Sequence, residues 1–240
     1  ELSENKKIKW KSSLALVKKN SESHQDHKFK FTDKYLETRV VSVTSFGYGR
    51  QVSQGSGFII DSKGTIVTNA HVVEGAAKVS VSATIKINKG STLHATFDVD
   101  VLKVGSVRDK DVAILQIKNQ GNIKFDYLPL IAKNIAPAPL TEIAMAGYPL
   151  GEARFNNVSY NLGRTQSINK DPDMQNNIDY LLVDMSGQHG SSGSGVIDTR
   201  TGRVLGIFTR FASESEGGIT KLAMVVPTKY IWEMLEKIKR

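Results

Sequence analysis

A succession of short strand-like runs, joined by short turns with no helical pattern between them, most constrains what this sequence can fold into. The runs are rich in β-branched side chains, and Thr38–Phe46 (TRVVSVTSF) alternates polar with apolar residues. A parallel sheet would need helical segments between its strands, so the pattern favours antiparallel barrels. The predicted strands are Thr38–Phe46, Ser56–Asp61, Thr65–Thr68, Lys78–Ile87, Leu93–Val104, Asp111–Lys118, Thr141–Gly147, Val158–Ile168, Ile178–Met185, Gly195–Thr199, Arg203–Phe211 and Lys221–Val226.

The chain ends in one predicted helix. It begins at Pro227, whose fixed φ suits the first position of a helix. Apolar side chains follow at Ile231, Met234, Leu235 and Ile238, a spacing that places them on one helical face. We therefore predict an amphipathic helix that packs this face against a barrel.

Residues 1–30 are polar and basic, and they precede the first predicted strand. Eight lysines and four acidic residues give this segment a charge of 8 − 4 = +4, half of the net +8. Because Trp10 and Phe29 lie among these charges, contact with nucleic acid or another anionic surface is one interpretation. No stacking motif or basic stripe recurs downstream, so we favour a solvated extension that packs through Trp10, Leu14 and Val17. We expect no nucleic-acid partner.

The composition excludes several classes of site. The chain has no cysteine, and therefore no disulfide, no thiolate nucleophile and no cysteine zinc site. No apolar run approaches the roughly 18 residues of a membrane-spanning helix. His24, Asp26 and His27 could be imagined as metal ligands, but that polar segment lacks a fourth ligand and a rigid frame. We predict neither a metal nor a cofactor.

Residues Gly190–Gly195 (GSSGSG) are six consecutive glycines and serines between two apolar runs. Such a backbone can turn sharply and present bare N–H groups. A serine hydroxyl on this turn could act as a nucleophile, with the N–H groups stabilising the oxyanion that it forms. A flexible linker is the alternative, although linkers are usually flanked by polar sequence. A catalytic turn also requires a base and an orienting acid elsewhere in the chain.

His71 is the candidate base. It lies just after the strand-like run Thr65–Thr68, where a short turn or helix begins, a position that combines precise placement with access to solvent. His94 and His189 are the alternatives. His94 lies within a predicted strand and looks like a residue on its face, whereas His189 directly precedes the glycine-serine turn and fits the lining of a substrate cleft.

Asp109 and Asp111 are the candidate orienting acids. Asp111 abuts the apolar run Val112–Leu115 and should be buried and well fixed. Asp109 lies between Arg108 and Lys110 and should be solvated. We predict Asp111, because an orienting carboxylate must be rigid and shielded from water.

Base, acid and serine occur in the order of a trypsin-like serine protease, and the surrounding sequence resembles that family. The HtrA/Deg group is the branch that it resembles most, over about residues 36–235. The ordered set of motifs is far more specific than any single one of them. The motifs are Gly55–Ile60 (GSGFII), Thr68–Val73 (TNAHVV), Asp111–Leu115 (DVAIL), Ala146–Gly151 (AGYPLG), Gly190–Gly195 (GSSGSG), Gly202–Ile207 (GRVLGI) and Val225–Pro227 (VVP).

The resemblance implies a fold and a set of roles. The fold would be two six-stranded antiparallel β-barrels with the active site in the cleft between them. Ser192 would be the nucleophile, His71 the general acid and base, and Asp111 the group that orients the imidazole. The backbone N–H groups of Gly190 and Ser192 would form the oxyanion hole.

The resemblance also implies where a substrate binds. Thr209, Arg210 and Phe211 would form an edge strand that pairs with the substrate main chain. The floor of the primary specificity pocket would lie near Ser186, where there is no carboxylate, and glutamyl endopeptidases place a histidine where this chain has Phe208. We therefore expect small or medium apolar residues before the scissile bond, rather than basic or acidic ones.

Two positions depart from the family pattern. Ser191 stands where the family usually has Asn or Asp, so activation through an ion pair to a new N-terminus is not available. Ser194 and Gly195 replace the commoner Gly-Pro or Ser-Pro, which we interpret as tolerated variation.

The expected organisation is an N-terminal extension over residues 1–30 and a trypsin-like domain over residues 31–240. Within that domain the first barrel should span about 36–125, the second about 135–226 and the terminal helix 227–239. We expect no PDZ domain, because this helix ends the chain.

We therefore predict a serine endopeptidase that hydrolyses extended or unfolded polypeptides through an acyl-enzyme. The alternative is a catalytically silent scaffold of the same fold that binds a partner through residues 1–30. Inactive relatives normally lose a catalytic side chain, and all three are present here. HtrA-like enzymes are often trimers, but we see no interface signature and expect a monomer. We also expect export to a bacterial periplasm, envelope or medium, and the chain begins with Glu1, as a processed product would.

Overall fold

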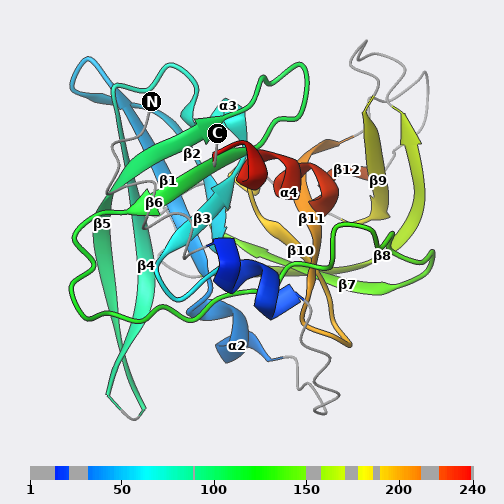
Figure 1. Cartoon of the computed structure of the whole chain (residues 1–240), viewed down its shortest axis with the longest axis horizontal. Coiled ribbons are helices and arrows are strands. Elements are labelled where there is room, and N and C mark those ends of the chain that lie inside the picture. The colour runs from blue at the N-terminus through cyan, green and yellow to red at the C-terminus, as the bar shows by residue number, and fades with distance from the viewer. Residues whose placement is uncertain are drawn as a thin grey trace.

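The computed structural model describes residues 14–21, 32–88, 90–149, 158–170, 178–185, 190–211 and 222–238. Within them the chain forms two closed six-stranded barrels that lie side by side (Figure 1). The first contains β1 (Val40–Gly47), β2 (Arg50–Ile59), β3 (Thr65–Thr68), β4 (Lys78–Asn88), β5 (Ser91–Val104) and β6 (Ala113–Ile117). The second contains β7 (Glu142–Gly147), β8 (Ser159–Lys170), β9 (Asp179–Asp184), β10 (Gly195–Asp198), β11 (Val204–Phe211) and β12 (Leu222–Pro227).

Both barrels have the same kind of antiparallel connectivity. Their strand orders are β1-β2-β3-β6-β5-β4 and β10-β11-β12-β9-β8-β7. The labelled helices are α2 (Asp33–Glu37) before β1, α3 (Ala70–Val73) after β3, and α4 (Thr228–Lys237) after β12. A further helix covers residues 14–21. The predicted all-β double barrel with a C-terminal helix is therefore confirmed.

The first hairpin differs most from the predicted strands. β1 and β2 form one continuous hairpin around the two-residue turn Tyr48–Gly49, so that β2 begins at Arg50 rather than at Ser56. Both turn residues have positive φ (51° and 77°), as a type I′ hairpin turn requires. The polar, glycine-rich start of β2 lacks strand composition, and pairing with β1 overrides that local preference.

The buried apolar side chains form three groups. One fills the first barrel, with Val43 and Leu115 among its members, and another fills the second barrel around Val183 and Val225. The third joins the barrels to each other and to the helices, and it includes Phe58. Burying such a side chain fully stabilises the fold by about 1.5–3 kcal/mol. The barrels are thus packed as one body, and elements of both can place side chains in a common site.

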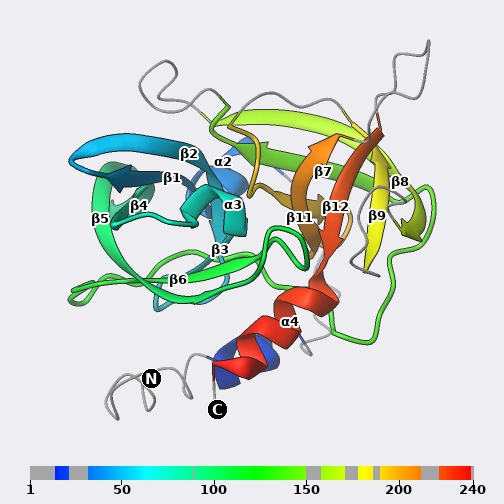
Figure 2. The ribbon, with the colours of Figure 1, turned by 90° about the horizontal axis from the view of Figure 1, so that it is seen from above.

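The C-terminal helix packs as its sequence pattern predicts. Ile231, Met234, Leu235 and Ile238 are all buried in the group that joins the barrels. The helix formed by residues 14–21 lies at the same end of the molecule (Figure 2). Among the described residues, no helix combines the length and the apolar character needed to cross a bilayer.

Part of the basic N-terminal segment is docked on this core. Leu14 and Val17 are fully buried against it. The guanidinium of Arg203 donates to the carbonyls of Asn20 and Ser21, which holds the end of this helix on the second barrel. The rest of the segment, including Trp10 and the candidate metal ligands His24, Asp26 and His27, lies outside the described residues.

Asp126 joins three segments of the first barrel. Its carboxylate accepts from the Thr38 hydroxyl (2.6 Å) and from the Lys86 ammonium (2.6 Å), and the Arg39 guanidinium lies 3.5 Å away. Partial burial alone would raise the pKa of Asp126, but the hydrogen bonds from Lys86 and Thr38 and the charge of Arg39 outweigh it. The pKa of Asp126 is therefore held below its ordinary value.

Asp126→Asn should lower the free energy of unfolding by about 1–2 kcal/mol at pH 7, because it removes charge-assisted hydrogen bonds. A lowered folded-state pKa stabilises the protein above the unfolded-state value of about 3.9, and this contribution disappears as the pH falls through the folded value. Urea unfolding at pH 7 and pH 2 measures the difference, which should vanish at pH 2. Asp98→Asn is the control, since it removes only the exposed ion pair with Lys78, and it should change stability less.

Candidate active site

His71 lies at the junction that the sequence predicts. The buried strand β3 ends at Thr68, Asn69 follows in extended conformation, and the short helix α3 carries the histidine. The His71 side chain is 35% exposed, so one edge of the imidazole is open while its backbone belongs to a rigid element. This placement suits a group that must exchange protons with a bound molecule.

Asp111 holds the imidazole from one side. Its Oδ2 lies 2.9 Å from His71 Nδ1, and its Oδ1 accepts from the backbone N–H of His71 at 3.0 Å. The Thr209 hydroxyl donates to the same Oδ2 from the second barrel. Asp111 is only 3% exposed, whereas its neighbour Asp109 is exposed. The structure thus places Asp111, and not Asp109, against His71.

The backbone at Asp111 is strained and is held in place by its neighbours. Its φ is +35°, in the region that side chains other than glycine rarely adopt. The Asn69 side-chain amide donates to the Asp111 carbonyl (2.8 Å), and the Asp111 N–H donates to the carbonyl of Ser106 (3.0 Å). Two hydrogen bonds therefore fix a conformation that aims the carboxylate at His71.

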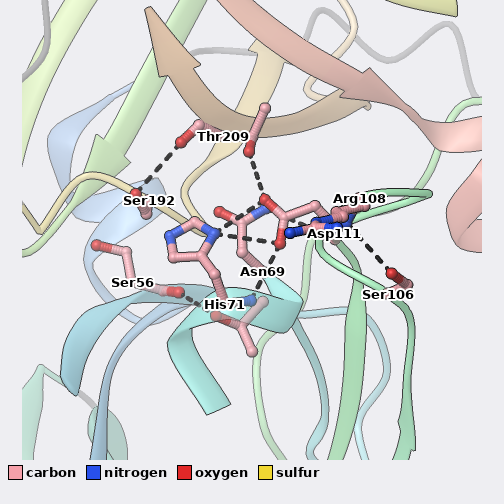
Figure 3. A network of polar contacts seen from close by, with 9 residues as sticks. Ser56, Asn69, His71, Ser106, Arg108, Asp111, Ser192 and Thr209 are labelled. Atoms are coloured by element: carbon pink, nitrogen blue, oxygen red, sulfur yellow. Dashed lines mark hydrogen bonds and ion pairs between the residues drawn. The ribbon is translucent and has the colours of Figure 1, made fainter. Parts of the chain in front are cut away.

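The stretch Gly190–Gly195 forms a tight turn between the two barrels. Gly190 and Gly193 both have strongly positive φ (89° and 91°), and the Ser194 N–H donates to the Ser191 carbonyl at 3.0 Å. Of the two interpretations of this stretch, a turn or a flexible linker, the geometry favours the turn. Figure 3 shows the His71 ring between Asp111 on one side and Ser192 on the other.

The Ser192 hydroxyl belongs to the same polar network. It donates to the Thr209 carbonyl at 3.4 Å, a long and therefore weak hydrogen bond (Figure 3). Thr209 in turn donates its hydroxyl to Asp111. Serine, threonine, aspartate and histidine are thus connected in one chain of contacts across both barrels.

Gly193 is a position where only glycine fits. A Cβ there would lie 1.9 Å from the carbonyl oxygen of Ser56 and 2.6 Å from the Thr68 hydroxyl, in addition to the cost of the positive φ. Gly193→Ala should therefore lower the free energy of unfolding by roughly 3–5 kcal/mol. Thermal and urea unfolding of the variant measure this loss.

Gly90→Ala separates the steric cost at Gly193 from the cost of the backbone conformation. Gly90 has nearly the same φ, +88°, but a Cβ there would meet nothing within 4 Å. We expect this control to cost only about 1–2 kcal/mol. Equal losses in the two variants would show that the close approach of Ser56 to the turn does not matter.

The pairing between β10 and β11 ends before the predicted substrate strand does. β11 pairs with β10 as far as Ile207, but its pairing with β12 continues to Phe211. A β-bulge lies between Phe208 and Arg210, and the Thr209 hydroxyl at the bulge contacts Asp111. Phe208 is buried, and its ring packs edge-on against that of Phe211, with 5.3 Å between the centroids.

The other candidate residues lie elsewhere. Ser186 and His189 are outside the described residues. His94 lies in β5, and its Nδ1 contacts the Thr84 hydroxyl of β4 at 3.3 Å, away from His71. In the described part of the chain, no group of three or more His, Cys, Asp or Glu side chains is arranged to hold a metal.

Two contacts of this site were not predicted from the sequence. The Thr209 hydroxyl contacts Asp111, whereas from the sequence we expect Thr209 only to bind the substrate main chain. Asn69 supports the Asp111 backbone, whereas in the sequence it stands out only as part of the Thr68–Val73 motif. Both contacts join residues far apart in the chain, so no local pattern reveals them.

Comparisons with known proteins identify the family. The family model described as a trypsin-like peptidase domain matches residues 55–207, more than half of the chain. The chain therefore belongs to the trypsin-like peptidase domain family, and the predicted resemblance is confirmed.

The similar curated proteins are HtrA proteases. HhoA of Synechocystis sp., which is named as a serine protease, is 33% identical over 170 residues, covering 70% of this chain and 39% of HhoA. The serine endoprotease DegS of Salmonella typhimurium is 29% identical over 192 residues, covering 78% of this chain and 48% of DegS. This chain thus spans less than half the length of these relatives.

A solved structure shares the fold. The active form of the Rv3671c protease of M. tuberculosis superposes with a TM-score of 0.66 at 24% identity, covering 85% of this chain and 82% of that one. At this identity the likeness bears on the fold alone, and it agrees with the double barrel.

Proposed function

We propose that this protein is a serine endopeptidase in which Ser192, His71 and Asp111 form the catalytic triad. The observation that carries the proposal is the contact of the buried Asp111 carboxylate with His71 Nδ1 at 2.9 Å, with Ser192 across the ring. The carboxylate fixes the ring so that Nδ1 carries a proton and Nε2 is left as the base. The family membership supports this reading.

The reaction would begin with proton transfer from Ser192 to His71 Nε2 as Oγ attacks the scissile carbonyl carbon. The imidazolium would then protonate the leaving amine, which leaves an acyl-enzyme for water to hydrolyse by the reverse sequence. In the structure the Ser192 hydroxyl donates to the Thr209 carbonyl instead. Catalytic hydrogen bonds are often long or misaligned before substrate binds, and a rotation about χ1 would redirect this hydroxyl.

The backbone N–H groups of Gly190 and Ser192 would stabilise the oxyanion. A trans peptide group directs its N–H away from its C=O. The Ser191 carbonyl accepts from the Ser194 N–H, so the N–H of Ser192, in the same peptide group, points to the opposite side. Donors fixed in this way lower the energy of the developing negative charge without reorganising during the reaction.

The substrate would bind as an extended strand beside Thr209, Arg210 and Phe211, whose edge is not paired with β10. A folded protein rarely offers such a strand, so we propose unfolded or extended polypeptides as substrates. Position 186 carries no carboxylate and position 208 no histidine, so neither a basic nor an acidic preference has support, and we propose small or medium apolar residues before the scissile bond. A related protein from Haemophilus influenzae is named as periplasmic, and we propose export for this chain too.

A fluorophosphonate probe tests the proposed nucleophile. We expect one covalent adduct per chain, located at Ser192 by peptide mass mapping, together with hydrolysis of unfolded casein. Sequencing of the casein products should show apolar residues before the cut sites, and a profile dominated by Arg, Lys or Glu would contradict the proposed specificity. A folded protein that neither reacts nor hydrolyses, yet binds a polyanion in a salt-sensitive way, would support the scaffold function instead.

A further inference from the structure

Ser56 connects the first barrel to the Gly190–Gly195 turn through its backbone N–H and its hydroxyl. It lies in β2 and is fully buried. Its backbone N–H donates to the Ser192 carbonyl (2.7 Å), and its hydroxyl donates to the Gly190 carbonyl (2.8 Å). The same hydroxyl accepts from the N–H of Tyr148, directly after β7, at 2.9 Å. Its own carbonyl accepts from the Thr68 hydroxyl at 2.7 Å.

Three glycines leave room for this close approach. A Cβ at Gly55 would lie 2.9 Å from the Ser192 carbonyl oxygen. A Cβ at Gly147 would lie 2.6 Å from the Ser56 hydroxyl, and one at Gly193 would lie 1.9 Å from the Ser56 carbonyl oxygen. These glycines come from β2, from the end of β7 and from the turn itself. The close approach of Ser56 to the turn and to Tyr148 therefore depends on all three segments.

The contacts restrain three successive peptide groups of the turn. The carbonyls of Gly190 and Ser192 are both held by Ser56, and the carbonyl of Ser191 between them is held by the Ser194 N–H. The middle peptide group carries the N–H of Ser192. Rotating it would require its neighbours to rotate as well, because adjacent peptide planes share a Cα. With both neighbours hydrogen-bonded, the N–H of Ser192 keeps one direction.

We propose that Ser56 is a positioning residue for the oxyanion hole, acting across the barrel interface. Its hydroxyl fixes the Gly190 carbonyl and, together with the other contacts of the turn, the direction of the Ser192 N–H that would meet the oxyanion. This inference rests on the proposed peptidase function. It assigns a task to the serine of the GSGFII motif, which contacts neither His71 nor Asp111 in the described contacts.

The test compares Ser56→Ala with a matched control, Thr165→Val. The Thr165 hydroxyl makes the same two kinds of bond, donating to the Ala138 carbonyl (2.6 Å) and accepting from the Thr141 N–H (2.9 Å). It is equally buried but lies in β8, outside the site. Both variants remove one buried hydroxyl that hydrogen-bonds two backbone groups, so both should lose stability.

Only the Ser56 variant should lose catalysis. We expect kcat to fall roughly 10- to 100-fold with KM little changed, the effect of misplacing an oxyanion donor. The affinity for a peptidyl boronic acid, which forms a tetrahedral adduct with the active serine, should fall by a similar factor. Thr165→Val should keep kcat and boronate affinity near those of the unaltered protein, when both variants are assayed well below their melting temperatures.

The outcomes separate this inference from the proposed function. If the unaltered protein hydrolyses casein and Ser56→Ala keeps full kcat and boronate affinity, Ser56 does not position the turn. Equal losses of kcat in both variants would also overturn the inference, since they would reflect stability alone. If the unaltered protein shows no hydrolysis and no labelling of Ser192, the function itself fails. Should Ser56→Ala not fold, Ser56→Cys, which keeps a weaker donor, is measured in its place.

Discussion

Ser192→Ala is expected to abolish peptide hydrolysis, with kcat about 10⁶-fold lower than in the unaltered protein. The methyl group cannot attack a carbonyl carbon, and neither His71 nor Asp111 can replace the missing nucleophile. The folded state should change little, because among the described residues the removed hydroxyl makes only the long contact with the Thr209 carbonyl. Initial rates on an unfolded polypeptide and a melting curve measure the two effects separately.

A second serine provides the control for this variant. Ser82 contacts Thr96 across the β4–β5 hairpin at 3.0 Å and has no part in the proposed site. Ser82→Ala should therefore keep the rate of the unaltered protein. Residual hydrolysis by Ser192→Ala at more than a few per cent of that rate would rule out Ser192 as the nucleophile.

Asp111→Asn should lower kcat by about 10⁴-fold. Three donors converge on the carboxylate: the backbone N–H of His71, its Nδ1 and the hydroxyl of Thr209. An asparagine side chain presents two hydrogens of its own in this space. It therefore favours the imidazole tautomer with the proton on Nε2, which cannot accept the serine proton. The measurement is kcat at fixed pH, together with a melting curve.

Asp61→Asn is a closely matched control. Asp61 is also fully buried and also accepts from three donors: the N–H of Lys63, the N–H of Thr65 and the hydroxyl of Thr65. These bonds stabilise the turn between β2 and β3, and none of them involves His71 or Asp111. We expect Asp61→Asn to be less stable but to keep kcat within a few-fold. A similar loss of kcat in both variants would mean that general destabilisation explains the effect of Asp111→Asn.

The fold was largely predictable because its signals are local. Strand-like runs recur along the chain, and the spacing of Ile231, Met234, Leu235 and Ile238 predicted the buried face of α4. The start of β2 was missed because its polar residues form a strand only by pairing with β1. Local composition therefore predicts helices and strands that have an apolar face better than it predicts strands that form only by pairing with a neighbouring strand.

The candidate site was predictable in part. The positions of His71 and Asp111 at the ends of apolar runs predicted where each side chain lies, and the structure places them in contact. The supporting contacts had no such signal. Ser56 and Gly190 are separated by 134 positions in the chain, and Thr209 and Asp111 by 98. Only the docking of the barrels brings these pairs together, so their roles require the three-dimensional structure.

The division of the proposed site between two barrels has a consequence for the order of events during folding. His71 and Asp111 belong to the first barrel, whereas Ser192 and Thr209 belong to the second. Domains of this size form early contacts locally and long-range ones late. A chain synthesised from its N-terminus therefore contains the proposed base, His71, long before it contains the proposed nucleophile, Ser192. If the proposed triad is correct, the site would become complete only when the two barrels dock, at a stage when little of the chain remains unfolded.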